Sequence, residues 1–284
     1  MKQRRILLIA VLLLTIAALG IALWRSYRPP PTPGAAPVIS DLTPSQIDHI
    51  RIRYGSNLLE IARSNTGWRL SAPVQAPVDT AHLKAILSLL GQPAQQSYAP
   101  RAIEQTKTGL ADHPLVVRFG QIGPIRIGGP GPSRGSRYVA TPHALLLADL
   151  PAFGGLQWGW THWISRALVP PQRQLQKLVL PHFTLVRDDR GRWQAQPAGQ
   201  RSAAAVATTA QTWLRAQALA ITPADQSRQR VARITLGFAE GTPRHFDIIE
   251  RYPNLILRDP ALGVDYHLAG NRIGPLLDIQ HPGL

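Results

Sequence analysis

Apolar and polar residues alternate over short stretches through most of the chain, which is the pattern of half-buried β-strands. In the first half, the alternation at Ile50 and Ile52 is followed by a turn at Gly67 and a strand that begins with Trp68. Residues 79–91 differ, because their apolar side chains recur at the three- and four-residue spacing of a helix. The pattern predicts an antiparallel sheet with one helix laid against it.

The second half repeats this order of elements. Trp193 follows Trp68 by 125 residues, and the predicted helix cap at Ser202 follows the cap at Asp79 by 123 residues. A similar offset across strand, turn and helix indicates an internal duplication. The residues expected to be buried on the second helix are Val206, Ala210, Trp213, Leu214 and Ala218. We predict fold class α+β, with two tandem repeats of an antiparallel β-sheet, each packed with one helix.

The N-terminus carries a long apolar run. Residues Ile6–Trp24 are apolar except Thr15, and as a helix they would extend about 28 Å, close to the hydrocarbon thickness of a bilayer. We expect an N-terminal transmembrane helix over residues 6–24. A cleaved signal peptide, with its cleavage site at residues 18–20, is the alternative, but the run is longer than a usual signal sequence.

The basic head, residues 1–5, favours a cytoplasmic N-terminus. We therefore expect a single-pass protein of the bacterial cytoplasmic membrane, with most of the chain periplasmic or extracytoplasmic. A run of prolines after the span predicts an extended spacer. The predicted segments are a cytoplasmic head at 1–5, a transmembrane helix at 6–24, a Pro-rich linker at 25–40, a first α+β repeat at 41–150, a Trp-rich connector at 151–174 and a second α+β repeat at 175–284.

Composition narrows the function further. The chain has 31 Lys plus Arg against 16 Asp plus Glu, a net charge of +15, and no cysteine. Without cysteine there are no disulfides, thiolate metal sites or lipid-modified N-terminal cysteine. The basic residues are spread thinly and no nucleic-acid recognition motif is present, so we expect no nucleic-acid partner. The excess of arginine is interpreted first as a coding bias on solvated faces, and an anionic polymer or a lipid headgroup as a ligand is the secondary interpretation.

Several motifs resemble catalytic sites without the context that such sites need. Gly131–Gly135 matches the Gly-x-Ser-x-Gly elbow around Ser133, but a strand follows it where a helix is required. His245 and Asp247 share a strand face with no visible third metal ligand, and Asp188–Asp189 occupy a tight turn. We expect no catalytic residues, no cofactor and no metal.

The most unusual stretch is a cluster of tryptophans at Trp158, Trp160 and Trp163. Large aromatic side chains readily fill cores, so the cluster is interpreted first as packing between the two repeats. The alternative is a partner-binding anchor, because exposed tryptophans concentrate binding energy at interfaces.

Several of these features together resemble a known family. The matching residues are Ile50-x-Ile52, Gly67-Trp68-Arg69-Leu70-x-x-Pro73, the capped Leu-rich helix, Thr108-Gly109-Leu110-x-x-x-Pro114 and Arg137-Tyr138-Val139. Over roughly residues 40–220 the chain resembles domain of unknown function 4340, a bacterial envelope family. The resemblance implies an N-terminal membrane helix and, as in some members, proximity to a gliding-motility-type ABC transporter. It implies no catalytic residues.

The leading hypothesis is a non-enzymatic, membrane-anchored accessory or scaffold protein of a bacterial envelope complex, with an ABC transporter as the associate that the resemblance suggests. Its expected partners are the lipid bilayer, through residues 6–24, and a membrane or envelope protein; the oligomeric state is open. One alternative is a binding module for an anionic envelope polymer or lipid headgroup. Another is an uncharacterised hydrolase that uses Ser133, His245 or Asp247.

Overall fold

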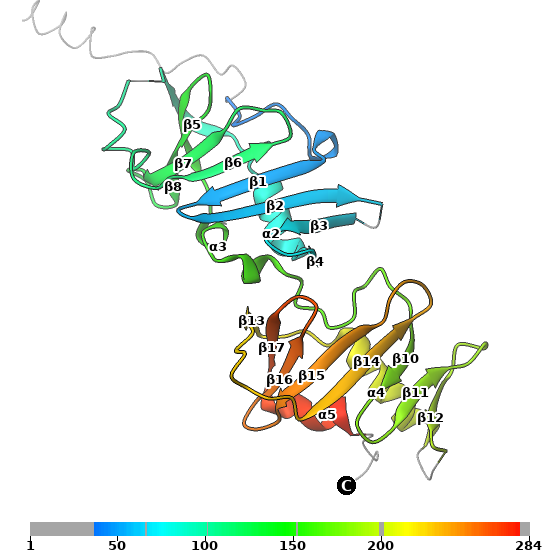
Figure 1. Ribbon diagram of the computed structural model, residues 1–284. Coiled ribbons are helices and arrows are strands. Elements are labelled where there is room, and N and C mark those ends of the chain that lie inside the picture. Colours follow the sequence, from blue (N-terminus) through cyan, green and yellow to red (C-terminus); the bar gives the residue numbers. More distant parts are fainter. Residues whose placement is uncertain (1–36, 66, 101, 152, 199–201, 279–284) are drawn as a thin grey trace, which may run out of the picture. The chain divides into compact units, whose positions relative to one another are not determined.

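Two antiparallel β-sheets follow one another along the chain (Figure 1). The structure is a computed structural model that describes residues 37–65, 67–100, 102–151, 153–198 and 202–278. Val38–Leu284 forms one compact unit, distinct from Met1–Pro37.

The first sheet has nine strands in the order β4-β3-β2-β1-β6-β7-β8-β9-β5. Its strands are β1 (His49–Tyr54), β2 (Asn57–Ser64), β3 (Gly67–Ala72), β4 (Ala76–Pro77), β5 (Ala94–Tyr98), β6 (Leu115–Phe119), β7 (Ile125–Pro130), β8 (Ser136–Ala140) and β9 (Leu145–Asp149). A 3₁₀-helix, η1 (Pro44–Gln46), precedes β1, and helix α2 (Thr80–Leu87) lies between β4 and β5 in sequence. Asp79 caps α2, since its Oδ1 accepts hydrogen bonds from the backbone N–H groups of Ala81 and His82.

The second sheet has eight strands in the order β12-β11-β10-β14-β15-β16-β17-β13. Its strands are β10 (Leu175–Val179), β11 (Thr184–Arg187), β12 (Trp193–Gln196), β13 (Ala220–Pro223), β14 (Ala232–Phe238), β15 (Arg244–Glu250), β16 (Leu255–Asp259) and β17 (Val264–Leu268). Helix α4 (Ala203–Arg215) is capped by Ser202, and the chain continues through η3 (Gly270–Arg272) into α5 (Ile273–Leu277).

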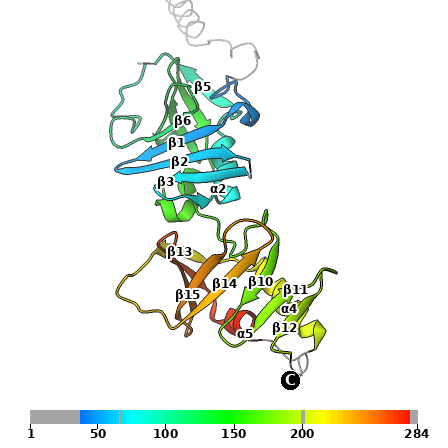
Figure 2. The ribbon, with the colours of Figure 1, turned by 45° about the vertical axis from the view of Figure 1, so that its right-hand side comes forward.

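The two sheets have the same strand order. Without the two-residue strand β4, the first reads β3-β2-β1-β6-β7-β8-β9-β5, and each position has its counterpart in the second sheet. In both, one helix follows the first three-strand meander and lies against the sheet (Figures 1 and 2). The tertiary structure therefore contains the duplication that the tryptophan and helix-cap spacings predicted.

Each core forms where a helix covers one sheet face. In the first half Leu83 and Ile86 of α2 are buried together with Ile50 and Ile52 of β1. In the second half Val206, Ala210 and Trp213 of α4 are buried, and the Trp213 indole Nε1–H donates to the Leu276 carbonyl at 2.8 Å. Leu214, predicted on the same buried stripe, is instead 37% exposed. It lies one residue beyond Trp213, which turns it about 100° away from the core.

The predicted α+β class is wrong, because the described chain is mostly β. Helices α2 and α4 have 8 and 13 residues, whereas the two sheets contain seventeen strands. The spacing of apolar residues does not reveal β5 and β13, which occupy equivalent sheet edges. An edge strand has only one neighbour, and Ala94–Tyr98 reads Ala-Gln-Gln-Ser-Tyr, without the apolar alternation that reveals a central strand.

The predicted transmembrane helix at residues 6–24 lies outside the described residues, as does the basic head. Within the described part of the chain, no helix is long and apolar enough to cross a bilayer. This finding contradicts the prediction of a single-pass protein anchored in the bacterial cytoplasmic membrane with a periplasmic bulk, and that localisation is not carried further.

A ladder of alternating charges crosses four strands of the second sheet. The cross-strand neighbours are Arg233 with Asp247, Asp247 with Arg258, and Arg258 with Asp265. Arg233 Nε donates to Asp247 Oδ1 at 2.7 Å, and Arg258 Nε donates to Asp265 Oδ1 at the same distance. Cross-strand pairs of opposite charge stabilise the strand register.

The ladder predicts a loss of stability in acid. Burial raises the pKa of Asp247, but hydrogen bonds and charge from Arg233, and the charge of Arg230, outweigh burial and hold that pKa below its ordinary value. The unfolded chain then binds the proton more readily, so this contribution is present above the ordinary aspartate pKa of about 3.9 and is lost as the pH falls below it. We expect the melting temperature to fall between pH 5 and pH 3, and to fall less steeply in Asp247→Asn. Calorimetry across that range checks both, and an unchanged slope in the variant would contradict the assignment.

Candidate functional site

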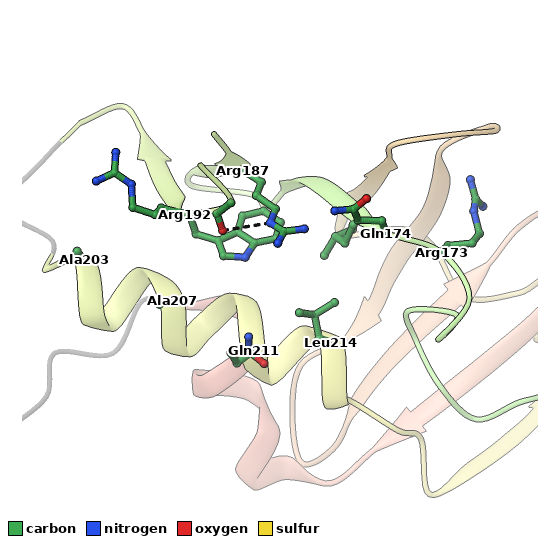
Figure 3. Close-up of a pocket in the computed structure, with 11 residues that line it drawn as sticks. Arg173, Gln174, Arg187, Arg192, Ala203, Ala207, Gln211 and Leu214 are labelled. Carbon is green, nitrogen blue, oxygen red and sulfur yellow. Dashed lines mark hydrogen bonds between the residues drawn. The ribbon is translucent and has the colours of Figure 1, made fainter. Parts of the chain in front are cut away.

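A cleft of about 490 Å³ opens between α4 and the strands of the first meander of the second sheet (Figure 3). Its size is within the usual range for a small-molecule site. The residues that line it are Arg173, Gln174, Leu175, Arg187, Gly191, Arg192, Trp193, Ala203, Ala207, Gln211 and Leu214.

The cleft exists because the side of α4 facing it carries small side chains. Ala203 and Ala207 are exposed, one helical turn apart, and do not fill the space. Figure 3 shows Ala203, Ala207, Gln211 and Leu214 along the helix, with Arg187 and Gln174 across from them. The helix buries a different face, so the sheet is left partly uncovered here.

Arg187 contributes a cation without a carboxylate partner. It is the last residue of β11 and the cross-strand neighbour of Trp193 on β12. Its Nε–H donates to the carbonyl of Gly191 at 3.1 Å, which holds the side chain over the turn. Among the described residues, no carboxylate forms an ion pair with Arg187. The N–H groups of its guanidinium other than Nε–H can therefore donate to an anionic ligand.

The neighbouring cation, Arg192, is neutralised within the turn. Asp188 accepts hydrogen bonds from the backbone N–H groups of Arg190 at 3.0 Å and Arg192 at 2.8 Å, and its Oδ2 lies 3.1 Å from Arg192 Nη2. The backbone N–H of Arg192, with that side chain, holds the pKa of Asp188 below its ordinary value. Asp188 therefore shapes the turn, as predicted for a carboxylate in this position.

Arg173 is the third guanidinium of the cleft. Its Nη2 donates to the carbonyl oxygens of Glu240 at 2.9 Å and Thr242 at 2.7 Å, and its Cζ lies 3.7 Å from the Phe238 ring centroid. Burial, followed by the positive charge of Arg244, lowers the pKa of Arg173. These contacts of Arg173 are with carbonyl oxygens, an aromatic ring and another arginine, and none of them is with a carboxylate.

The chemistry of the lining favours binding over catalysis. The cleft combines guanidinium groups and two glutamines with an apolar floor, and the described residues that line it include no Asp, Glu, His, Ser or Cys. General acid–base or nucleophilic catalysis would need one of those groups close to the reacting atoms. The arrangement suits an anion held by a guanidinium.

The first half provides a comparison within the molecule. Arg63 and Trp68 are cross-strand neighbours at the position of Arg187 and Trp193, and Arg63 Cζ lies 5.0 Å from the Trp68 ring centroid. There the guanidinium Nη2 donates to the carbonyl of Pro44 in η1, at 3.0 Å. Each arginine therefore donates one hydrogen bond to a backbone carbonyl, Arg63 to Pro44 in a separate segment and Arg187 to Gly191 in its own turn.

The three tryptophans of the cluster, predicted as packing or as a partner anchor, differ in burial. The connector forms α3 (Phe153–Leu156) and η2 (Trp160–Trp163), and Trp163 is buried at 1% exposure. Trp160 is half-buried, and Trp158 is 55% exposed, with its ring centroid 4.7 Å from that of His162. A groove of about 320 Å³ lies beside them.

The residues considered for a hydrolase lie apart in the fold. Ser133 is in the β7–β8 hairpin of the first sheet, where its Oγ donates to Gln95 at 3.2 Å. His245 and Asp247 are on β15 of the second sheet; His245 contacts Thr235 at 3.0 Å, and Asp247 is paired with Arg233. Among the described residues, no group of three or more His, Cys, Asp or Glu side chains could hold a metal ion.

Sequence reasoning did not identify the arginines of the cleft. Arg187 and Arg173 belong to a diffuse arginine excess, and nothing in their local sequence separates them from exposed arginines elsewhere. The available signal was the repeated Arg/Trp pair at Arg63–Trp68 and Arg187–Trp193, which the duplication places at equivalent positions.

Comparison with protein-family models, with curated proteins and with solved structures finds no match to this chain. The resemblance to domain of unknown function 4340 therefore remains a prediction from the sequence.

Proposed function

We propose that this protein is a non-catalytic binding module that holds an anionic ligand in the cleft between α4 and the β11–β12 turn. The observation that carries the proposal is the guanidinium of Arg187, which has no carboxylate partner among the described residues and faces a cleft whose lining contains no acid. A planar guanidinium forms paired hydrogen bonds with phosphate or carboxylate oxygens.

The wider charge supports the same conclusion. The net charge of +15 creates a positive potential that attracts anions, but it does so over the whole surface. A specific anion site needs a cation at a cleft of suitable size. In the cleft, Arg187 supplies charge and the small residues of α4 supply space.

Methyl phosphate tests the charge requirement alone. We expect it to bind in the millimolar range, and Arg187→Gln to weaken binding about tenfold or more, because a hydrogen bond to a charged group contributes about 1.5–3 kcal/mol. Titration followed by NMR of the arginine and tryptophan side-chain N–H groups measures the affinity. Arg63→Gln is the matched control, since it removes the equivalent arginine of the first half, which donates to the Pro44 carbonyl and does not line the cleft. Equal losses in the two variants would show unspecific attraction and defeat the proposal.

A second candidate function is the accessory or scaffold role predicted from the sequence, with a protein partner. It is favoured by the exposure of Trp158, at 55%, beside a groove lined also by Tyr54 and Trp160. Exposed tryptophans next to a concave surface are typical of interface anchors.

A further inference from the structure

We infer that the ligand of the cleft is an anionic amphiphile with a single unbranched alkyl or acyl chain. The inference rests on the proposed function and extends it. Arg187 would hold the charged head, and the chain would lie along α4 over Ala203, Ala207 and Leu214. The anionic head and the apolar tail would each contribute to binding.

The apolar part of the site is continuous along the helix. Ala203, Ala207, Gln211 and Leu214 follow one another at intervals of four, four and three residues, so they form one stripe on α4. From Ala203 to Leu214 the stripe is about 16 Å long. Its only polar member is the uncharged Gln211. A stripe of this form fits an extended hydrocarbon chain better than it fits a compact polar ligand.

The opposite wall is also apolar where it faces the helix. Leu175 is buried at 2% exposure and Trp193 is half-buried, and both line the cleft. Leu214 is among the few large apolar side chains of the described residues that are more than a third exposed. A bound chain would remove its surface from water, together with that of Ala203 and Ala207, and this transfer is favourable.

The charges favour one head rather than a polyanion. Arg192 is paired with Asp188, and Arg173 is already bonded to the carbonyls of Glu240 and Thr242. Arg187 is left with most of its N–H groups unused. A polymer with many charges would need a row of free cations, which the described residues of the lining do not provide.

The test is a series of methyl, butyl and octyl phosphate, titrated calorimetrically into the full chain. A fully buried methylene tightens binding about fourfold, and in this open cleft we expect about twofold per methylene. Octyl phosphate should then bind about 100-fold more tightly than methyl phosphate. Octyl glucoside, with the same chain and no charge, should bind at least tenfold more weakly than octyl phosphate.

Two leucine substitutions separate the cleft from other apolar surfaces. Ala207→Leu fills the space on α4 and should reduce octyl phosphate binding at least tenfold. Ala204→Leu places the same side chain at an exposed position of the same helix that does not line the cleft, and should leave binding unchanged. Both variants should keep the melting temperature of the parent protein, which shows that they fold. Equal effects of the two on octyl phosphate binding would overturn the inference.

The outcomes for the inference and for the proposed function differ. If octyl and methyl phosphate bind equally and both depend on Arg187, the amphiphile is excluded and the anion-binding function stands. If neither binds, both fail. Vesicles of phosphatidylglycerol, whose lipids carry two chains, should not compete with octyl phosphate; competition that Ala207→Leu abolishes would overturn the single-chain assignment.

Discussion

Replacing Trp163 with alanine is expected to lower the free energy of unfolding by about 3–5 kcal/mol, the usual cost of removing a large buried aromatic side chain. Trp163 is 1% exposed, and its ring centroid lies 5.4 Å from that of His82 on α2. Its carbonyl accepts the backbone N–H of Asp79 at 2.8 Å, and the next residue, Ile164, forms a β-bridge with Val78. The substitution would leave a cavity where the connector is fastened to the start of α2. Denaturant unfolding followed by circular dichroism measures the change.

Trp158→Ala is the control from the same cluster. Because Trp158 is 55% exposed, its removal should change the free energy of unfolding by less than about 1 kcal/mol. The variant should keep the fold, so it also tests the accessory role. A partner protein that is retained by the native chain through contacts at position 158 should no longer be retained by Trp158→Ala. If Trp158→Ala and Trp163→Ala destabilise equally, the whole cluster is packing and the partner role is lost.

Asp265→Asn is expected to destabilise the protein by about 3–5 kcal/mol, because it breaks a buried ion pair and leaves only the more distant Asp225 and Asp247 to offset the charge of Arg258. Asp265 and Arg258 form two hydrogen bonds, of 2.7 and 2.9 Å, and their side chains are 4% and 10% exposed. Arg258 also donates to the carbonyls of Asp225 and Arg228, so it fastens the segment between β13 and β14 to the sheet. Thermal unfolding should show the loss, and limited proteolysis should show earlier cleavage near residues 224–231.

The first sheet supplies a matched control for this ion pair. Arg51 and Glu60 are also cross-strand neighbours with a nitrogen–oxygen distance of 2.7 Å, but their side chains are 51% and 24% exposed. Glu60→Gln should cost less than about 1 kcal/mol, because water already solvates both partners. Similar losses in Glu60→Gln and Asp265→Asn would mean that burial does not decide the strength of these pairs.

Local patterns predicted the central strands and the helix starts because those features depend on neighbouring residues. The alternation at Ile50 and Ile52 gives β1, and a polar cap before an apolar spacing gives α2 at Asp79 and α4 at Ser202. The fold class was wrong for a related reason. The edge strands β5 and β13 are held by their pairing with β9 and β17, and nothing within their own sequence shows it.

The sequence did not predict the candidate site, because its residues come from separate segments of the chain. Arg173 before β10, Arg187 on β11 and Ala207 on α4 are separated along the chain and line one cleft only because the helix lies across the sheet. The fold decides which carbonyl oxygen lies within hydrogen-bond distance of each arginine. Arg63 and Arg187 both pair across strands with a tryptophan, yet only Arg63 meets the carbonyl of Pro44.

The sequence by itself determined the duplication, the strands at Ile50–Ile52 and Trp68 and the starts of both helices, because these follow from the spacing of apolar residues and from local capping. It also determined the absence of cysteine and the positive charge. Only the tertiary structure decided that the fold is mostly β, that Trp163 is buried while Trp158 is exposed, and that Arg187 faces an apolar cleft. Those properties depend on contacts between distant residues, and such contacts exist only in the folded chain.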